Sequence, residues 1–323
     1  MTKPLISIIV LNWQNATETI NCITSLLKLN YNNFNIIVCD NDSHDSSVSE
    51  MSNWCQSNQV LYSLYNENDI NLKNSNLSNH IYIIKNNKNY GYAGGNNVGI
   101  KFALKNSACE YVWVLNNDTS VHPESLESML NKMESTKGLG VCGSLLLHES
   151  DKDIIQAAGG VFNAKLCTTR HLLENRLVST VTSEEASKLS PDYAVGASML
   201  IKREVFENIG ILFEDYFLYY EEIDFALRVK KQYKIAIDFN SHVYHKLGDS
   251  IKRGKSELAD YLSVRNRLIV SRRFYPQNFA FVWLSLIIVF VNRCRRRQFK
   301  RAQKILTIMF FDSWKILFKY KAV

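Results

Sequence analysis

The chain has 323 residues, 46% of them hydrophobic and 21% charged, which excludes a disordered chain and predicts one large or two ordinary globular domains. Its formal net charge of +7 is uneven, because residues 252–323 carry 17 Lys and Arg but only 3 Asp and Glu, while the remainder has a net charge of −7. An acidic body with a basic tail indicates a polyanionic partner, either an anionic membrane surface or nucleic acid.

Strand and helix patterns alternate along the first part of the chain, which predicts βαβ units and a parallel sheet. The first apolar run follows directly on residues 1–4, without a secretory signal pattern, and the seven cysteines include no C-x-x-C pair, so we expect reduced thiols in a cytosolic protein. The Asn-rich stretch 58–80 is predicted to be a variable loop. The predicted elements here are strands at Leu5–Leu11, Phe34–Cys39 and Ile81–Ile84, and helices at Ala16–Leu29 and Ser46–Gln56.

A glycine-rich segment, Gly91–Gly99, follows the third strand and precedes a helix that we expect to end near Lys105. The glycines allow close approach of the backbone. Their spacing is not G-x-G-x-x-G, and the loop after the first strand contains no glycine, which argues against a Rossmann dehydrogenase.

The stretch Tyr111–Thr119 begins as a buried strand and ends in Asn116, Asn117 and Asp118. Ligands bind at the carboxyl ends of strands in open α/β sheets, and these oxygen atoms suit Mg²⁺ or Mn²⁺ completed by substrate phosphates. The alternative is a plain strand-to-helix loop in which Asp118 or Thr119 caps the helix after Pro123.

Later in the chain, Glu221, Glu222 and Asp224 open a predicted helix that follows an aromatic run, residues 216–220. Three acids in a first turn could simply stabilise the helix dipole, or one of them could be a general base beside aromatic walls. We expect the last core strand at Tyr233–Phe239, followed by His245, which is either structural or a metal ligand. Further predicted elements are strands at Gly140–Leu147 and Asp192–Ile201, an inserted hairpin around Gly159-Gly160 within 151–191, and a short helix at Arg203–Asn208.

The chain is predicted to be helical from Ser256 to its end. The apolar run Phe279–Val291 has thirteen residues, short of the roughly 20 needed to span a bilayer, and the basic cluster Arg293–Arg301 follows it. This pattern, with a second apolar helix at Ile305–Phe318, favours an interfacial membrane anchor, and the alternative is a helical pair docked on the body or a partner chain. We expect no nucleic-acid partner, because the basic block contains no recognisable nucleic-acid module.

Six motifs in order give the chain a resemblance to the family 2 inverting glycosyltransferases of the GT-A fold, a Rossmann-like, mostly parallel sheet with flanking helices. It looks most like the bacterial rhamnosyltransferases of lipopolysaccharide O-antigen and capsule assembly. The motifs are S-I-I-V-L-N-W at 7–13, V-C-D-N-D-S at 38–43, N-Y-G-Y-A-G-G-N-N-V-G-I at 89–100, V-L-N-N-D-T at 114–119, Y-Y-E-E-I-D-F-A-L-R at 219–228 and H-K-L-G-D-S at 245–250.

The resemblance implies a role for each candidate residue. Asp40 would contact the nucleoside base, with Asn12 and the loop Gly91–Asn97, including Asn96 and Asn97, shaping the pocket. Asn116, Asn117 and Asp118 stand at the family's D-x-D position, so Asp118 would hold the metal largely alone, and His245 matches a histidine that reaches the metal or diphosphate in some members. The general base would be Glu222, with Glu221 and Asp224 as alternatives.

The implied activity is transfer of a sugar, rhamnose by this resemblance, from a dTDP- or UDP-sugar to a hydroxyl of a glycan or lipid-linked acceptor, with Mg²⁺ or Mn²⁺. A galactofuranosyl- or hexosyltransferase and a non-catalytic nucleotide-sugar-binding scaffold are the alternatives. We expect a GT-A domain at residues 1–255 and a basic helical segment at 256–323. We also expect a peripheral position on the cytoplasmic face of the bacterial inner membrane.

Overall fold

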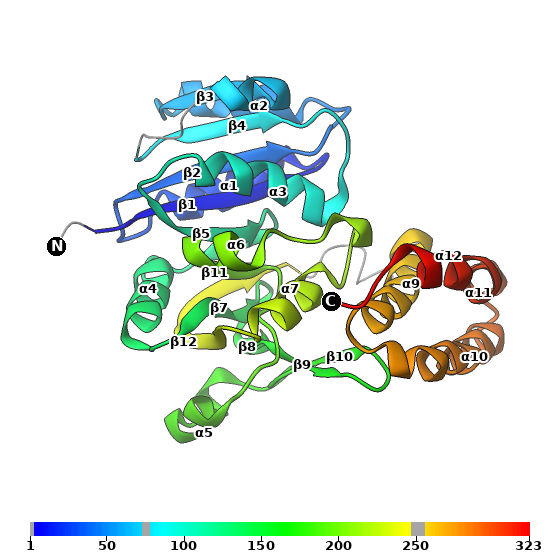
Figure 1. Cartoon of the computed structure of the whole chain (residues 1–323). Helices are drawn as coiled ribbons and strands as arrows, with labels where there is room; N and C mark the ends of the chain where they lie inside the picture. The colour runs from blue at the N-terminus through cyan, green and yellow to red at the C-terminus, as the bar shows by residue number, and fades with distance from the viewer. Residues whose placement is uncertain (1–2, 73–77, 247–255) are drawn as a thin grey trace.

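A mixed sheet of ten strands forms the centre of the protein, and residues 3–72, 78–246 and 256–323 are described by this computed structural model (Figure 1). The main path of the sheet has the order β3-β4-β2-β1-β5-β11-β7-β12-β6, and β8 pairs with β7. The strands are β1 Leu5–Asn12, β2 Phe34–Asp40, β3 Tyr62–Asn66, β4 Ile81–Lys85, β5 Cys109–Asn116, β6 Thr119–Val121, β7 Leu139–His148, β8 Asp151–Ala157, β11 Ser198–Lys202 and β12 Lys234–His245.

Most of the sheet is parallel, as the sequence predicts. Strands β3, β4, β2, β1 and β5 are parallel neighbours, and β12 is parallel to β7. Strand β11 runs antiparallel to both β5 and β7. Strand β2 is buried along its whole length, which explains its nearly continuous apolar sequence. The carboxyl ends of β1, β2 and β5 therefore meet at one edge of the sheet.

Helices cover both faces of this sheet. One layer comprises α1 Ala16–Leu26, α2 Ser47–Ser57 and α4 Ser125–Ser135. The opposite layer comprises α3 Gly91–Leu104, α6 Arg203–Ile209 and α7 Glu221–Val229. Together with the sheet they form an α/β sandwich, and the predicted fold class is confirmed.

The inserted region between β7 and β11 contains β8 and a separate two-stranded hairpin, β9 Gly160–Asn163 and β10 Thr168–His171. The expected hairpin is present, but Gly159-Gly160 joins β8 to β9 and the hairpin turn lies at 164–167. A short helix, α5 Ser183–Lys188, follows.

The C-terminal helices form a lobe beside α7 (Figure 1). They are α9 Glu257–Phe274, α10 Phe279–Arg295, α11 Phe299–Thr307, the π-helical turn η5 Ile308–Asp312 and α12 Ser313–Lys319. Ile223 and Ala226 of α7 share one buried cluster with Leu268 of α9 and Val282 of α10. The predicted domain boundary at 255/256 adjoins residues 247–255, which lie outside the described part of the chain, and the helices beyond it pack directly on the α/β body.

Further local expectations differ from the structure. Within the stretch 58–80, residues Tyr62–Asn66 form the edge strand β3, which is half-exposed and so lacks a long apolar signal. The segment Gly91–Gly99 is already helical, because its glycines let α3 pack closely on β1 and β2: a Cβ on Gly99 would lie 2.7 Å from the Cys39 sulfur. Finally, His242 and His245 lie within β12, not after it.

The helical segment 276–295 is longer than the thirteen-residue apolar run Phe279–Val291 within it. By length and composition, Pro276–Arg295 could cross a membrane, although nothing else about the helix requires this. The predicted second apolar helix is divided into α11, η5 and α12.

Candidate active site

The candidate site lies at the sheet edge where β1, β2 and β5 end. Parallel pairing places Asn12 opposite Asp40 and Asn116 opposite Leu11. This edge is where the topology of an open α/β sheet creates ligand-binding crevices.

A hydrogen-bonded network fixes the polar side chains of this edge. Asn12 Nδ2 donates to Asp40 Oδ1 at 2.7 Å, and Asn12 Oδ1 accepts from the Thr19 hydroxyl at 2.7 Å. Asn117 Nδ2 in turn donates to Thr19 Oγ1 at 3.0 Å. Asn12 and Asp40 are almost completely buried, so their orientation is fixed before any ligand binds. The structure thus joins Asn12, Asp40 and Asn117, which the sequence analysis singled out. The link between them is Thr19, which the sequence analysis did not identify.

The start of α3 lies against the same edge. The side-chain nitrogen Nδ2 of Asn41 donates to the carbonyl of Gly91 at 3.1 Å and to Asn89 Oδ1 at 2.9 Å. Gly91 has φ +72°, and a Cβ there would lie 2.2 Å from the Phe217 carbonyl oxygen, so only glycine fits. Asn41 is a further residue that organises this edge.

The two asparagines of the glycine-rich segment have different surroundings. Asn96 Nδ2 donates to the Tyr92 carbonyl at 2.9 Å, and its buried Oδ1 makes no hydrogen bond with any residue that the structure describes. The side-chain nitrogen of Asn97 donates to the Leu212 carbonyl and to Glu214 Oε1 at 2.8 Å, and the side-chain oxygen accepts from the Leu212 amide nitrogen. Asn97 therefore has a structural position, joining α3 to the segment that precedes α7.

Asp118 pairs with the predicted histidine. Antiparallel pairing of β6 with β12 sets His245 opposite Thr119, and His245 Nε2 lies 3.2 Å from Asp118 Oδ1. On its other side, His245 Nδ1 donates to the amide oxygen of Gln156 at 2.6 Å, which leaves Nε2 directed at the carboxylate. The other residues of the sixth motif, 247–250, lie outside the described residues.

These two residues fit a divalent cation by their chemistry. A carboxylate oxygen and an imidazole nitrogen are suitable ligands for Mn²⁺, and a histidine held by a hydrogen bond on its other nitrogen is the usual arrangement of a metal ligand. Among the residues that the structure describes, no group of three His, Cys, Asp or Glu converges on a metal position. Asp118 and His245 would therefore supply two ligands, and the substrate would complete the shell.

The acid cluster at the start of α7 divides into three environments. Asp224 is fully buried, and its two oxygens accept from Arg228 at 2.8 Å and Arg273 at 2.7 Å, so its role here is structural. Burial raises the pKa of Glu221 well above its usual range, and the adjacent charge of Glu222 raises it further. Burial therefore disfavours the charged form of Glu221, whereas Glu222 is only partly buried.

A buried tyrosine connects the acid pair with the metal-binding candidates. The hydroxyl of Tyr92, in the first turn of α3, donates to the Gly196 carbonyl. Burial raises the pKa of Tyr92 well above its usual value, and the nearby carboxylates of Glu221, Glu222 and Asp118 raise it further. The three carboxylates, from α7 and from the turn after β5, therefore share the neighbourhood of one side chain.

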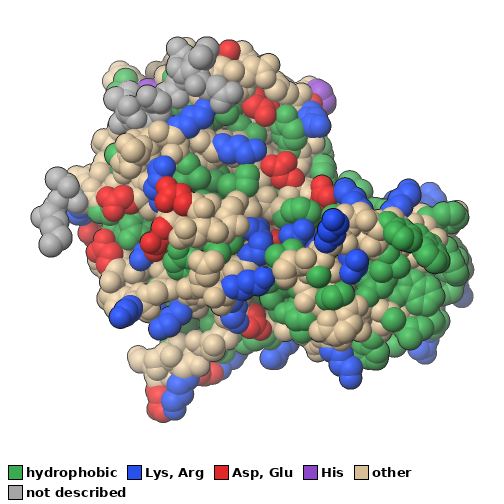
Figure 2. All heavy atoms as spheres, in the orientation of Figure 1, with side chains coloured by type: hydrophobic (Ala, Val, Ile, Leu, Met, Phe, Trp, Pro, Cys, Tyr) green, Lys and Arg blue, Asp and Glu red, His purple; other side chains and the backbone are tan. Residues whose placement is uncertain are grey.

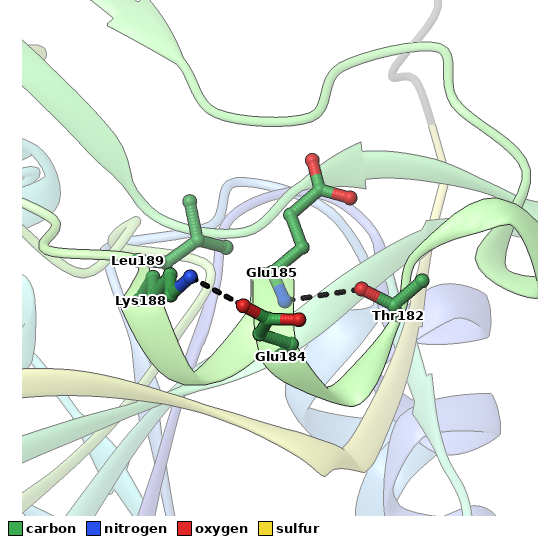
Figure 3. Close-up of a pocket in the computed structure, with 5 residues that line it drawn as sticks. All are labelled: Thr182, Glu184, Glu185, Lys188 and Leu189. Atoms are coloured by element: carbon green, nitrogen blue, oxygen red, sulfur yellow. Dashed lines mark hydrogen bonds and ion pairs between the residues drawn. The ribbon is translucent and has the colours of Figure 1, made fainter.

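Other polar surface features lack this convergence. Figure 3 shows the surface hollow at α5, where Thr182 caps the helix by accepting from the Glu185 amide at 3.1 Å and Lys188 pairs with Glu184. All these contacts are within one short helix and its cap. This hollow therefore offers no arrangement for chemistry.

Comparison with known proteins identifies the family. The family described as glycosyl transferase family 2 matches residues 7–210. The chain belongs to glycosyl transferase family 2. The match covers the sheet edge with Asn12, Asp40 and Asp118, and this glycosyltransferase is therefore an enzyme of the transferase class.

A curated relative and two solved structures are similar to this glycosyltransferase. The low-salt glycan biosynthesis hexosyltransferase Agl10 of Haloferax volcanii is 27% identical over 289 residues, covering 88% of this chain and 81% of the relative. The crystal structure of GalNAc-T7 with UDP, GalNAc and Mn²⁺ superposes with a TM-score of 0.62 at 12% identity, over 87% of this chain and 50% of that one. The mannosyltransferase PcManGT of Pyrobaculum calidifontis, in complex with GDP-Man and Mn²⁺, gives a TM-score of 0.56 at 12% identity, over 98% of this chain and 72% of that one.

These similarities confirm the family and the GT-A-like fold predicted from the sequence. The narrower resemblance to rhamnosyltransferases of O-antigen assembly is not confirmed. The assigned roles of individual site residues remain predictions.

Proposed function

We propose that this glycosyltransferase transfers a hexose-type sugar from a nucleotide diphosphate donor to a hydroxyl of a glycan or lipid-linked acceptor, with inversion at the anomeric carbon. The observation that supports this most is the pair of Asp118 and His245, 3.2 Å apart, at the sheet edge where Asn12 holds Asp40. The hexosyltransferase relative supports a hexose. Rhamnose, a 6-deoxyhexose, remains a candidate within this class, in the cell-surface polysaccharide context that the sequence suggests.

In this proposal each group has a separate task. Asp40, held by Asn12, accepts hydrogen bonds from the nucleoside base. Asp118 and His245 would hold Mg²⁺ or Mn²⁺, which would supply positive charge to neutralise the leaving diphosphate. Glu222 accepts the proton of the acceptor hydroxyl. The oxygen of that hydroxyl bonds to the anomeric carbon while the bond between this carbon and the diphosphate breaks. Burial disfavours the charged form of Glu221, which would limit the negative charge beside the attacking oxygen.

A donor screen tests the proposed activity directly. We expect the protein to hydrolyse at least one UDP-, dTDP- or GDP-sugar slowly in Mn²⁺ or Mg²⁺, with water as the acceptor, measured as released nucleotide. Mannose, glucose, galactose, rhamnose and galactofuranose donors cover the sugar candidates. If none of them is hydrolysed although at least one binds, a non-catalytic nucleotide-sugar-binding scaffold would be the better description.

We further propose that the C-terminal lobe holds the enzyme on the cytoplasmic surface of an anionic membrane. Figure 2 shows apolar side chains gathered over this lobe, with Lys and Arg at its margins. Exposed apolar residues on α10, α11, η5 and α12 make up this apolar face: Phe281, Leu284, Ile287, Ile288, Val291, Phe299, Leu306, Phe310, Phe311, Trp314 and Phe318. A face of this composition, beside the exposed Arg295, Arg296 and Arg297, is typical of an interfacial anchor.

Contacts on the inner side of α10 favour an interfacial position over a membrane crossing. Ser285 accepts from Arg267 of α9 at 2.8 Å, and Arg293 pairs with Asp260. The indole of Trp283 donates to the Met309 carbonyl at 2.9 Å. These polar contacts attach the helix to its neighbours along one side, so lipid would reach only the other side.

Substitution of three exposed aromatic residues tests membrane binding. The triple variant Phe311→Ser, Trp314→Ser, Phe318→Ser should bind vesicles of anionic lipid at least tenfold more weakly, since each large apolar side chain contributes about 1.5–3 kcal/mol when buried. Co-sedimentation at low and high salt measures this, and high salt should weaken binding of the unmodified chain.

The control is a triple variant of exposed leucines elsewhere, Leu61→Ser, Leu64→Ser, Leu177→Ser. Its vesicle binding should equal that of the unmodified chain. Equal binding by the aromatic variant would contradict the membrane proposal and favour a partner chain on the apolar face.

A further inference from the structure

The acid pair is preceded by an unusual backbone turn. Phe217, Tyr219 and Tyr220 have φ of +65°, +69° and +78°, although none is glycine. Left-handed conformations are unfavourable for bulky residues and persist only where the surroundings hold them. Tyr220 is the N-cap of α7, so this turn sets the direction in which Glu221 and Glu222 leave the loop.

One side chain of α9 bonds to three carbonyls of this turn. The Asn266 amide nitrogen donates to the carbonyl oxygens of Tyr216 at 3.1 Å, Leu218 at 2.9 Å and Tyr219 at 2.8 Å. Asn266 is completely buried, and its own oxygen accepts from Arg265 at 2.8 Å, which fixes the orientation of the amide. Asn266 is thus a shared donor to three carbonyls of the turn, of which that of Tyr216 also accepts from the Leu218 amide nitrogen at 2.8 Å.

The remaining carbonyl of the turn points the other way. The Phe217 oxygen accepts from the Tyr92 amide nitrogen at 2.6 Å, at the start of α3. The turn therefore lies between α3, which contributes to the donor edge, and α9, which belongs to the C-terminal lobe. Positive φ at Phe217 and Tyr219 lets successive carbonyls face these two helices in opposite directions.

Two arginines of α9 extend the contact on either side of Asn266. Arg265 donates to the Tyr216 carbonyl at 3.0 Å, and Arg273 pairs with Asp224 in the first turn of α7. The loop before the acid pair and the helix after it are consequently both bound to α9.

We propose that Asn266 is a positioning residue for glycosyl transfer, whose amide holds the 216–220 turn so that Glu221 and Glu222 face the donor edge beside Tyr92. The inference rests on the proposed function of Glu222. It also assigns the C-terminal lobe a part in catalysis in addition to membrane attachment, because the base is held from α9.

The substitution Asn266→Asp tests this role, since aspartate has the same shape but its carboxylate cannot donate to carbonyls. We expect kcat for hydrolysis of the nucleotide sugar found in the donor screen to fall about 100-fold, the scale of a misplacement of about 1 Å. The donor KM should stay within about twofold, because Asp40 and Asp118 are held by other contacts. Asn266→Ala, which adds no charge, should show the same split if the aspartate variant does not fold.

The matched control is Asn278→Asp. Asn278 also donates its amide to a carbonyl of the body, that of Ala164 at 3.0 Å, but at a place away from the turn. Its kcat should stay within about twofold of the unmodified enzyme. Hydrogen exchange supplies a readout independent of activity: amides 217–224 should exchange faster in Asn266→Asp than in the control, while those of β1 and β2 should not change.

The outcomes separate this inference from the proposed function. Unchanged kcat and unchanged hydrogen exchange in the Asn266 variants would overturn the positioning role of Asn266. A loss of activity equal to the loss of nucleotide-binding sites would overturn it as well. If the unmodified chain hydrolyses no donor, the proposed function fails, and hydrogen exchange alone then decides whether Asn266 holds the turn.

Discussion

Replacing Glu222 with glutamine should lower kcat by about 10²–10⁴-fold, the usual contribution of general acid–base catalysis, and leave donor and metal affinity near normal. Glutamine keeps the size of the side chain and removes its basicity. Glu222 is the partly exposed member of the acid pair, whereas burial disfavours the charged form of Glu221. Steady-state transfer or donor hydrolysis measures kcat, and calorimetry with Mn²⁺ and nucleotide measures binding.

The neighbouring acids provide the controls for this substitution. Glu221→Gln should change kcat far less, because glutamine keeps the size of a buried side chain whose charged form burial already disfavours. Asp224→Asn should reduce stability, since it weakens a buried contact with Arg228 and Arg273, and breaking such contacts costs about 3–5 kcal/mol. Near-normal turnover in Glu222→Gln together with a collapse in Glu221→Gln would transfer the base role to Glu221.

The sheet was predictable where strands are buried on both faces. Leu5–Leu11 and Phe34–Cys39 are nearly continuous apolar runs rich in β-branched residues, and both form central strands with the expected parallel pairing. Strand β3 was missed because it is an edge strand in which Leu64 is exposed, so its sequence carries no apolar run. The helical start at Gly91 was missed because glycine has low helix propensity, and close packing against β1 and β2 outweighs that preference.

The site was predictable only where local sequence and pairing agree. Asn12 and Asp40 each end an obvious strand, and parallel pairing brings such ends together. Gln156 contacts His245 across 89 positions of the chain, and Asn266 reaches the 216–219 carbonyls across 47 to 50. Their partners depend on how the inserted strand β8 and the C-terminal lobe pack, which no local pattern contains. The three acids of α7 likewise look equivalent in sequence, and only their burial and ion pairs distinguish them.

Asp118→Ala should weaken cation-dependent nucleotide binding by at least about tenfold, and donor turnover should fall with it. The physical reason is the small number of protein ligands. With Asp118 and His245 as the protein's two candidate ligands in the described residues, removing the carboxylate leaves a single neutral imidazole to hold a divalent cation. Calorimetric titration of UDP or GDP with and without Mn²⁺ measures the effect, and EDTA should abolish turnover of the unmodified enzyme.

An exposed acid on the adjacent strand β8, Asp151, supplies the matched control, because Asp151→Ala removes the same charge without a contact to His245. Its Mn²⁺-dependent binding should be unchanged.

Kinetics should also distinguish the roles of Asp118 and Glu222. Loss of Asp118 should impair binding of the donor itself, whereas loss of Glu222 should leave binding intact and slow the chemical step. Full activity in EDTA, or normal Mn²⁺-dependent binding in Asp118→Ala, would remove Asp118 from metal binding. The 3.2 Å contact with His245 would then only hold the turn after β5 against β12, with the imidazole fixed between Gln156 and Asp118.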